Sequence, residues 1–353
     1  MNFDVDQRSI LLVRHGSHAY GLNTPESDED FKGVCIKPKE AYFGFTQRFE
    51  QYERMGNKEG GNLAALKSLK GKDADVVIYS LEKFASLAAD CNPNIIEVLH
   101  VDDSDIIKID SFGEELRARR DDFLSKKAKF TFSGYAHAQL HRIKTHRKWL
   151  LDPPKTAPTR EEFGLNEKVK VSKSELGAFD SLLGMPSIDD GAHVSPMQQA
   201  IAIKLAAEEK LGIELPKDVV TLFTREKAYQ AAMAHYGQYQ NWLKTRNPKR
   251  AELEAKFGYD TKHGMHLYRL ELMGIEILEK HRVHVKWFDE QRDFLMGIRR
   301  GSLSYDDLVE GAEKLETRAE ELYQTSTLRR EADRVSIDRF LVDMTERYLR
   351  LRG

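Results

Sequence analysis

The sequence of 353 residues contains only two cysteines, Cys35 and Cys91, and they show no spacing typical of a metal site. This scarcity argues against a disulfide-rich secreted scaffold. The chain also lacks an uninterrupted apolar stretch long enough to span a bilayer. Its N-terminus has acids before a short apolar run and does not resemble a signal peptide. We therefore expect a soluble, cytoplasmic protein with no membrane partner.

A strong net charge is also missing, because the formal charge is −2 at pH 7. The surface as a whole is thus not suited to nucleic acid, and any such contact must come from a local basic patch. The chain does have 41% hydrophobic residues, enough for a substantial core. Its length predicts two domains, or one domain with a large extension. Nothing in the sequence indicates the oligomeric state.

The pattern of apolar residues predicts an α+β fold, with a small sheet and its helices followed by a larger helical region. Strands are expected at 10–13, 31–36 and 74–79, and a helix at 81–89. The polar stretch 47–73, which contains Gly60-Gly61, is expected to be an insertion or a mobile loop. A connection rich in Pro, Gly and Ser, with little regular structure, is expected from 153 to 196. Further helices are expected at 135–150, 197–211, 219–245, 262–280, 305–322 and 336–351.

The most informative segment lies between the first two expected strands and reads GSHAYGLNTPESDED from Gly16 to Asp30. Gly16 allows the backbone to approach a phosphate closely, and Ser17 adds a hydroxyl donor. A helix expected to start here would direct unpaired N–H groups at a triphosphate. Asp28 and Asp30 are two residues apart on an extended segment, so their carboxylates leave the same face. Such a pair can bind Mg²⁺ or Mn²⁺.

A third carboxylate on the neighbouring expected strand would complete a two-metal site for phosphoryl transfer. Asp75 is the preferred candidate, with Asp73 as a competitor on the same strand face. Each part also has a plainer interpretation. Gly-Ser alone is a turn, and Asp-x-Asp alone is more often a solvated loop than a metal site.

The Gly-Ser pair, ten residues and Asp-x-Asp resemble the signature of the DNA polymerase β superfamily of nucleotidyltransferases. Three more stretches, DVVIYSLEKFASLAADCNPNIIEVL, GYDTKHGMHLYRL and IRRGSLSYDDL, extend the resemblance to the RNA-repair-associated (RlaP-type) group. The resemblance implies that Asp28, Asp30 and Asp75 are catalytic metal ligands. It also implies a polymerase-β-like catalytic domain over 1–120 and a helical domain over 121–353 that contributes to nucleotide and acceptor binding.

A cationic stripe is expected on the 262–280 helix, where Lys262, His266 and Arg269 fall at i, i+4 and i+7, with His263 on the flank. These groups suit a triphosphate, a leaving pyrophosphate or an acceptor phosphate. The alternative is a surface or capped helix, because Tyr259-Asp260-Thr261 supplies candidate N-caps. Its apolar stripe would comprise Met265, Leu272 and Ile275.

The segment Ser125–Lys148 contains seven Lys or Arg, three His and no acid. It is the best candidate for an RNA contact, although ordinary helices also carry solvated basic faces. His137, His141, Lys144 and Lys148 lie opposite the apolar stripe of the expected helix. The two histidines imitate a zinc pair, but the Glu of H-E-x-x-H and an obvious third ligand are missing, which disfavours zinc.

Three residues near the motifs, Asn92, Glu97 and Lys32, are further candidates for contact with the substrate. Asn92 and Glu97 flank a helix stop that the resemblance places near the active-site wall. Lys32 projects on the same strand face as the acids, where it would pair with them or bind phosphate.

We expect an enzyme that moves a nucleoside monophosphate from ATP or another triphosphate to an acceptor hydroxyl, with an RNA end as the leading acceptor. The near-neutral charge mildly favours an alternative, nucleotidylation (AMPylation) of a protein or a small molecule. A third possibility is a non-catalytic nucleotide-binding module. The presence of all five motif residues argues against it; these are Gly16, Ser17, Asp28, Asp30 and Asp75. The sequence does not identify the nucleotide or the number of nucleotides added.

Overall fold

The computed structural model describes residues 3–54, 74–168, 170–184 and 196–352. Asp73 and Gly60-Gly61 lie outside these ranges. The chain forms two compact units, a larger one of residues 1–146 and 253–353 and a smaller one of residues 147–252. The expected functional division at residue 120 concerns catalysis and substrate binding, and it stays a prediction.

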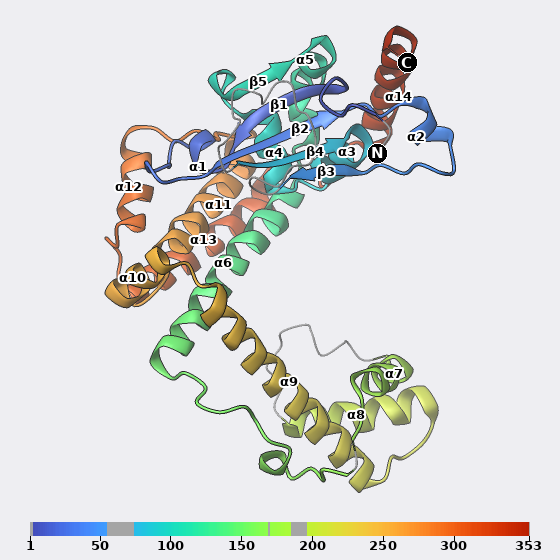
Figure 1. The fold of residues 1–353 in the computed structure, drawn as a ribbon, viewed down its shortest axis with the longest axis vertical. Coiled ribbons are helices and arrows are strands. Elements are labelled where there is room, and N and C mark those ends of the chain that lie inside the picture. The colour runs from blue at the N-terminus through green and yellow to red at the C-terminus, as the bar shows by residue number, and fades with distance from the viewer. Residues whose placement is uncertain (1–2, 55–73, 169, 185–195, 353) are drawn as a thin grey trace. The chain divides into compact units, whose positions relative to one another are not determined.

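The larger unit contains a mixed five-stranded sheet in the order β3-β4-β2-β1-β5 (Figure 1). β1 pairs antiparallel with β2 and β5, β3 pairs antiparallel with β4, and β2 and β4 are parallel. The strands are β1 (Ser9–His15), β2 (Glu29–Cys35), β3 (Gln51–Arg54), β4 (Ala74–Ser80) and β5 (Ile106–Ile109).

Alternating side chains place the two faces of the sheet in different cores. Phe31, Val76 and Ile78 pack in a small core on one face. Val13 and Val34 join the main core on the other face, together with the helices that follow β4. Because Asp30 and Asp75 neighbour residues of the small core in sequence, their side chains point to the helix-covered face.

Most helices belong wholly or partly to the larger unit. α11 is its central helix, and Phe132 of α6 and Leu308 of α13 pack against its glycines Gly274 and Gly264. Figure 1 shows α6, α11 and α13 running alongside one another. The helices are α1 (Gly16–Ala19), α2 (Lys39–Phe43), α3 (Leu81–Ala89), α4 (Pro93–His100), α5 (Ser111–Ala118), α6 (Lys127–Leu151), α10 (Pro248–Phe257), α11 (Thr261–Lys280), α12 (Asp289–Arg299), α13 (Tyr305–Thr325) and α14 (Arg334–Arg352).

The smaller unit is helical and has its own core of Leu183, Ile203, Ala207 and Val220. Arg160 of this unit makes a buried bidentate ion pair with Glu226, at 2.7 and 2.8 Å. Its helices are α7 (Lys173–Leu183), α8 (Pro196–Leu211) and α9 (Lys217–Thr245).

The predicted α+β class is confirmed, with a small mixed sheet followed by helices. The expected connection over 153–196 is wrong in part because it contains α7. A capping box explains this helix, since the Ser172 hydroxyl accepts from the Glu175 amide and the Glu175 side chain accepts from the Ser172 amide. The expected loop over 47–73 contains β3, and β5, α10 and α12 were not predicted.

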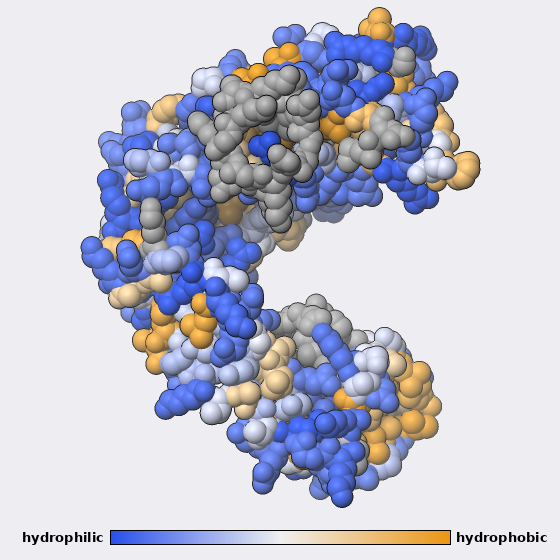
Figure 2. Space-filling model, in the orientation of Figure 1, coloured by the Kyte–Doolittle hydropathy of each residue, from blue (hydrophilic) through white to orange (hydrophobic). Residues whose placement is uncertain are grey.

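The visible surface is largely hydrophilic (Figure 2). Apolar side chains gather over α7 and α8 of the smaller unit, where Leu182, Met197, Ile201 and Leu205 are exposed. Among the described helices, none combines the length and the hydropathy needed to cross a bilayer.

Candidate active site

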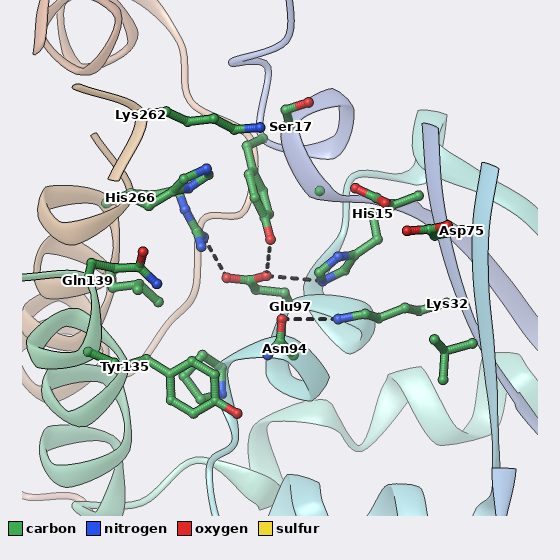
Figure 3. A pocket seen from close by; sticks show the side chains of 18 of the residues that line it. His15, Ser17, Lys32, Asp75, Asn94, Glu97, Tyr135, Gln139, Lys262 and His266 are labelled. Atoms are coloured by element: carbon green, nitrogen blue, oxygen red, sulfur yellow. Dashed lines mark hydrogen bonds and ion pairs between the residues drawn. The ribbon is translucent and has the colours of Figure 1, made fainter. Parts of the chain in front are cut away.

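A cavity of about 900 Å³ lies in the larger unit, between the sheet and helices α4, α6 and α11. We call two of its sides the sheet wall and the helical wall, and Figure 3 shows them facing each other. The sheet wall comprises His15, Gly16, Ser17, Asp28, Asp30, Lys32 and Asp75. The helical wall comprises Phe130, Thr131, Gly134, Tyr135, Ala138, Gln139 and Arg142 of α6 with Lys262, His266, Arg269 and Leu270 of α11.

Strand pairing aligns the acids of the sheet wall. His15 at the end of β1 pairs with Asp30 on β2, and Asp30 pairs in register with Asp75 on the parallel strand β4. Residues paired directly across neighbouring strands point to the same face. Asp28 lies two residues before Asp30 and also lines the cavity. The fold therefore brings together the three aspartates that the sequence proposed as metal ligands.

Gly16 sits against the central aspartate. Its φ of +66° lies in the left-handed region, which favours glycine. A Cβ added at this position would lie 2.1 Å from Asp30 Oδ2. The backbone of the Gly-Ser turn thus approaches the carboxylate as closely as a residue without a side chain allows.

The helix expected at Gly16-Ser17 is a single turn, α1, so it has little of the dipole of a longer helix. The segment after it is instead fixed from outside. His18 Nε2 lies 3.2 Å from the Ser27 carbonyl oxygen. Arg292 and Arg299 of α12 donate to the carbonyls of Gly21 and Leu22, at 2.8 and 2.6 Å. The C-terminal helices therefore hold the loop that joins Ser17 to Asp28.

The electrostatics of the aspartates fit a divalent cation. Burial, and next the negative charge of Asp75, raise the pKa of Asp30. A cation among the carboxylates would relieve this repulsion, and carboxylate oxygens are the ligands that Mg²⁺ and Mn²⁺ prefer. Within the described ranges, no three His, Cys, Asp or Glu side chains already converge in metal-binding geometry. The acids thus share a cavity without forming a closed ligand shell.

Lys32 extends into the cavity beside the acids, as the sequence suggested, and donates to Asn94 Oδ1 at 3.0 Å. Burial lowers the pKa of Lys32 to about 8. Asn94 lies in the first turn of α4, whose Asn92 cap accepts from the Asn94 amide at 3.1 Å. Lys32 is therefore held by α4 rather than paired with the aspartates.

Glu97 of α4 is fully buried at the base of the cavity and connects three elements. Its carboxylate accepts from the Tyr20 hydroxyl at 2.5 Å and from Arg269 at 2.5 Å. His15 Nε2 lies 3.1 Å from the same carboxylate. Burial alone would raise the pKa of Glu97, but Arg269 and His15 hold it well below its usual range. Figure 3 shows Glu97 at the centre of this network.

The residues expected to bind phosphate on α11 have different surroundings. Lys262 and His266 line the cavity. Arg269 also lines the cavity, but its guanidinium donates to the Glu97 carboxylate. His263 does not line the cavity. Its Nδ1 instead lies 2.7 Å from Gln139 Oε1. α11 is largely buried, and its Asp260 cap accepts from the Lys262 and His263 amides, so the expected cap is present.

The basic segment Ser125–Lys148 lies almost entirely within α6, and this helix has three faces. Ala136, Leu140 and Ile143 are buried in the core, and a second face lines the cavity. His137, His141, Lys144 and Lys148 are exposed, as expected for a solvated basic face. Asn92 lies outside the cavity lining and donates to the Tyr135 hydroxyl at 3.1 Å.

The sequence did not single out several residues of the site, including His15, Tyr20, Asn94 and Gln139. His15 was recognisable as the last residue of a strand before Gly-Ser. Burial lowers its pKa to about 4, so the ring is neutral at pH 7. The α6 residues carried no motif, and only the packing of α6 against α11 assigns them to the cavity.

Comparisons with known proteins relate the chain to one family and one phage protein. Residues 4–153 match the model of the RlaP family, described as the RNA repair pathway DNA polymerase beta family. The chain is also 24% identical over 330 residues to an uncharacterized 38.9 kDa protein of Enterobacteria phage T4, from the nrdC-mobD intergenic region. That match covers 88% of this chain and 90% of the phage protein. No solved structure matches the chain.

The N-terminal part of the chain is thus similar to polymerase-β-type nucleotidyltransferases. The RlaP resemblance inferred from the motifs is confirmed for residues 4–153. Because this region ends shortly after α6, it contains the sheet wall and the α6 part of the helical wall.

Proposed function

We propose that the chain transfers a nucleoside monophosphate from a nucleoside triphosphate to the terminal hydroxyl of an RNA. The observation that carries this proposal is the register of the sheet, which sets Asp30 beside Asp75 and against the backbone of Gly16. This arrangement offers carboxylates for divalent metal next to the Gly-Ser turn, which would bind the polyphosphate. The exposed basic face of α6 supports an RNA acceptor.

In the proposed reaction, the acceptor oxygen attacks the α-phosphorus, its proton passes to solvent water, and the bond from the α-phosphorus to pyrophosphate breaks. Asp28, Asp30 and Asp75 would hold Mg²⁺ or Mn²⁺, which would lower the pKa of the acceptor hydroxyl and stabilise the leaving pyrophosphate. Ser17 and Lys262 would bind the polyphosphate, since both line the cavity that contains Asp30 and Figure 3 shows them close to each other. Burial, and next Arg269, lower the pKa of His266 well below its usual value, so His266 acts as a neutral hydrogen-bonding group.

The direct test is to incubate the full chain with each α-labelled nucleoside triphosphate, Mg²⁺ and total RNA, and in parallel with cell protein. We expect label on RNA. Asp30→Asn should reduce transfer by at least about 10³-fold, because a lost metal ligand should cost more than the 10–100-fold typical of outer-sphere changes. Asp152→Asn removes an exposed acid outside the cavity and is the matched control.

Two results would change the proposal. Full Mg²⁺-dependent activity in Asp30→Asn, with unchanged circular dichroism, would remove the assigned metal site. Label on protein and none on RNA would favour nucleotidylation of proteins, a reaction for which the same cavity is suited.

A further inference from the structure

One side of the cavity is not used by the metal and phosphate chemistry proposed above. It is the α6 face, which we define as Phe130, Gly134, Tyr135, Ala138, Gln139 and Arg142. These positions recur at intervals of one to four residues and share one side of the helix. The buried stripe of α6 lies on a different side, so the α6 face is not needed for the core.

Two aromatic rings of the α6 face remain accessible. The exposed fraction is 56% for Phe130 and 38% for Tyr135. The Tyr135 ring is held in place, because its hydroxyl accepts from Asn92 Nδ2 at 3.1 Å. One residue from Phe130, the Thr131 hydroxyl donates to the Cys91 carbonyl at 2.7 Å and anchors the helix. A fixed, accessible ring on a cavity wall is suited to stacking against a planar group.

Space for such a group exists beside the rings. A Cβ added to Gly134 would meet no atom within 4 Å, and the next turn presents only the methyl group of Ala138. Polar groups border this open strip. Gln139 Oε1 is engaged by His263, which leaves the Gln139 amide NH₂ as a donor, and the Arg142 side chain is exposed. The α6 face thus combines stacking surface, open space and hydrogen-bond donors at the edge.

We propose that the α6 face binds a nucleobase, stacked on Tyr135 over Gly134, with its polar edge toward Gln139 and Arg142. This inference rests on the proposed function. The cavity volume of about 900 Å³ is at the upper end of the range for small-molecule pockets, so a triphosphate at the sheet wall leaves room for a base. The base belongs to the incoming nucleotide or to the terminal nucleotide of the acceptor, because the stacking chemistry of the two is the same.

The test compares three probes in the presence of Mg²⁺: a nucleoside triphosphate, inorganic tripolyphosphate and an oligoribonucleotide with a free 3′-hydroxyl. Tyr135→Ala removes the stacking surface, and Tyr135→Phe keeps the ring as its matched control. Gly134→Leu fills the open strip instead. We expect Gly134→Leu to fold normally, because leucine has a higher helix propensity than glycine and a Cβ at this position meets no atom within 4 Å.

For a base of the incoming nucleotide, Tyr135→Ala and Gly134→Leu should weaken triphosphate binding by about 5- to 100-fold and leave tripolyphosphate binding unchanged. For a base of the acceptor, the same loss should appear with the oligoribonucleotide only. Unchanged affinity for both nucleotide probes in both variants would overturn the inference while the proposed function stands. If the unaltered protein binds neither the triphosphate nor tripolyphosphate, the proposed function fails and the inference fails with it.

Discussion

The two walls of the cavity are assembled in different ways. The sheet wall is largely local, because one segment from His15 to Lys32 folds back on itself through the pairing of β1 with β2, and only Asp75 comes from another strand, β4. The helical wall joins α6 and α11, which are more than a hundred residues apart in the sequence. The sheet wall therefore has rigid geometry with little tolerance, whereas the helical wall depends on packing and should respond to substitution in a graded way.

The largest expected effect concerns Glu97, which connects the two walls. Glu97→Gln leaves Arg269 buried without its countercharge, and we expect a loss of about 3–5 kcal/mol in the free energy of unfolding. Chemical denaturation monitored by circular dichroism measures it. If the network instead contributes little, the change will be below about 1 kcal/mol, and the walls are independent.

A double variant provides the control for this prediction. Glu97→Leu with Arg269→Met removes both buried charges, and the pair should cost less than the sum of the two single changes. Additive losses would show that Glu97 and Arg269 do not stabilise each other.

The second prediction concerns Glu271, a buried residue of α11 that points away from the cavity. The Ser133 hydroxyl donates to Glu271 Oε2 at 3.2 Å, and burial raises the pKa of Glu271 to about 7. Because the folded state binds this proton more tightly than the unfolded state, stability should fall as pH rises from about 4.5 to about 7. Glu271→Gln should remove this loss and stabilise the protein at pH 8 by at most about 3 kcal/mol.

Thermal unfolding of Glu271→Gln and the unaltered protein at pH 5 and pH 8 tests the sign. The difference between them should be small at pH 5 and favour the variant at pH 8. A variant that is less stable at pH 8 would mean that the charged carboxylate is stabilised where it lies. Glu271 would then resemble Glu97, whose buried carboxylate is also stabilised in its charged form.

The same contrast explains how much of the site was predictable. The positions of Asp28, Asp30 and Gly16 in the site are predictable from the sequence, because the alternation of side chains along a strand and a short loop determine their neighbours. The role of Glu97 was not readable, since its partners come from three elements whose packing is a long-range property. α7 is different, because the Ser172–Glu175 capping box that starts it is a local pattern visible in the sequence. Asp73, the competitor of Asp75, lies outside the described residues, so that choice stays a prediction.

The third prediction tests the rigidity of the sheet wall. Gly16→Ala places a Cβ against Asp30 Oδ2 at a positive φ, so the turn or the carboxylate must move. Displacement of about 1 Å at a reacting centre costs about 100-fold in rate, and we expect a loss of at least that size in kcat. Gly177→Ala is the matched control, because its added Cβ meets no atom within 4 Å. Equal activity of the two variants would contradict a close approach at Gly16.

The smallest expected effect belongs to the helical wall. Lys262 is half-buried. Burial and the charge of Asp75 raise the pKa of Asp30, and the positive charge of Lys262 opposes this rise with a smaller effect. If Lys262 binds the polyphosphate in the ground state and the transition state alike, Lys262→Ala should raise KM for the triphosphate by about 10-fold and leave kcat nearly unchanged. Lys262→Arg should restore most of the affinity, since it keeps the charge. A fall in kcat at constant KM would instead assign Lys262 to the transition state, and the helical wall would then be as demanding as the sheet wall.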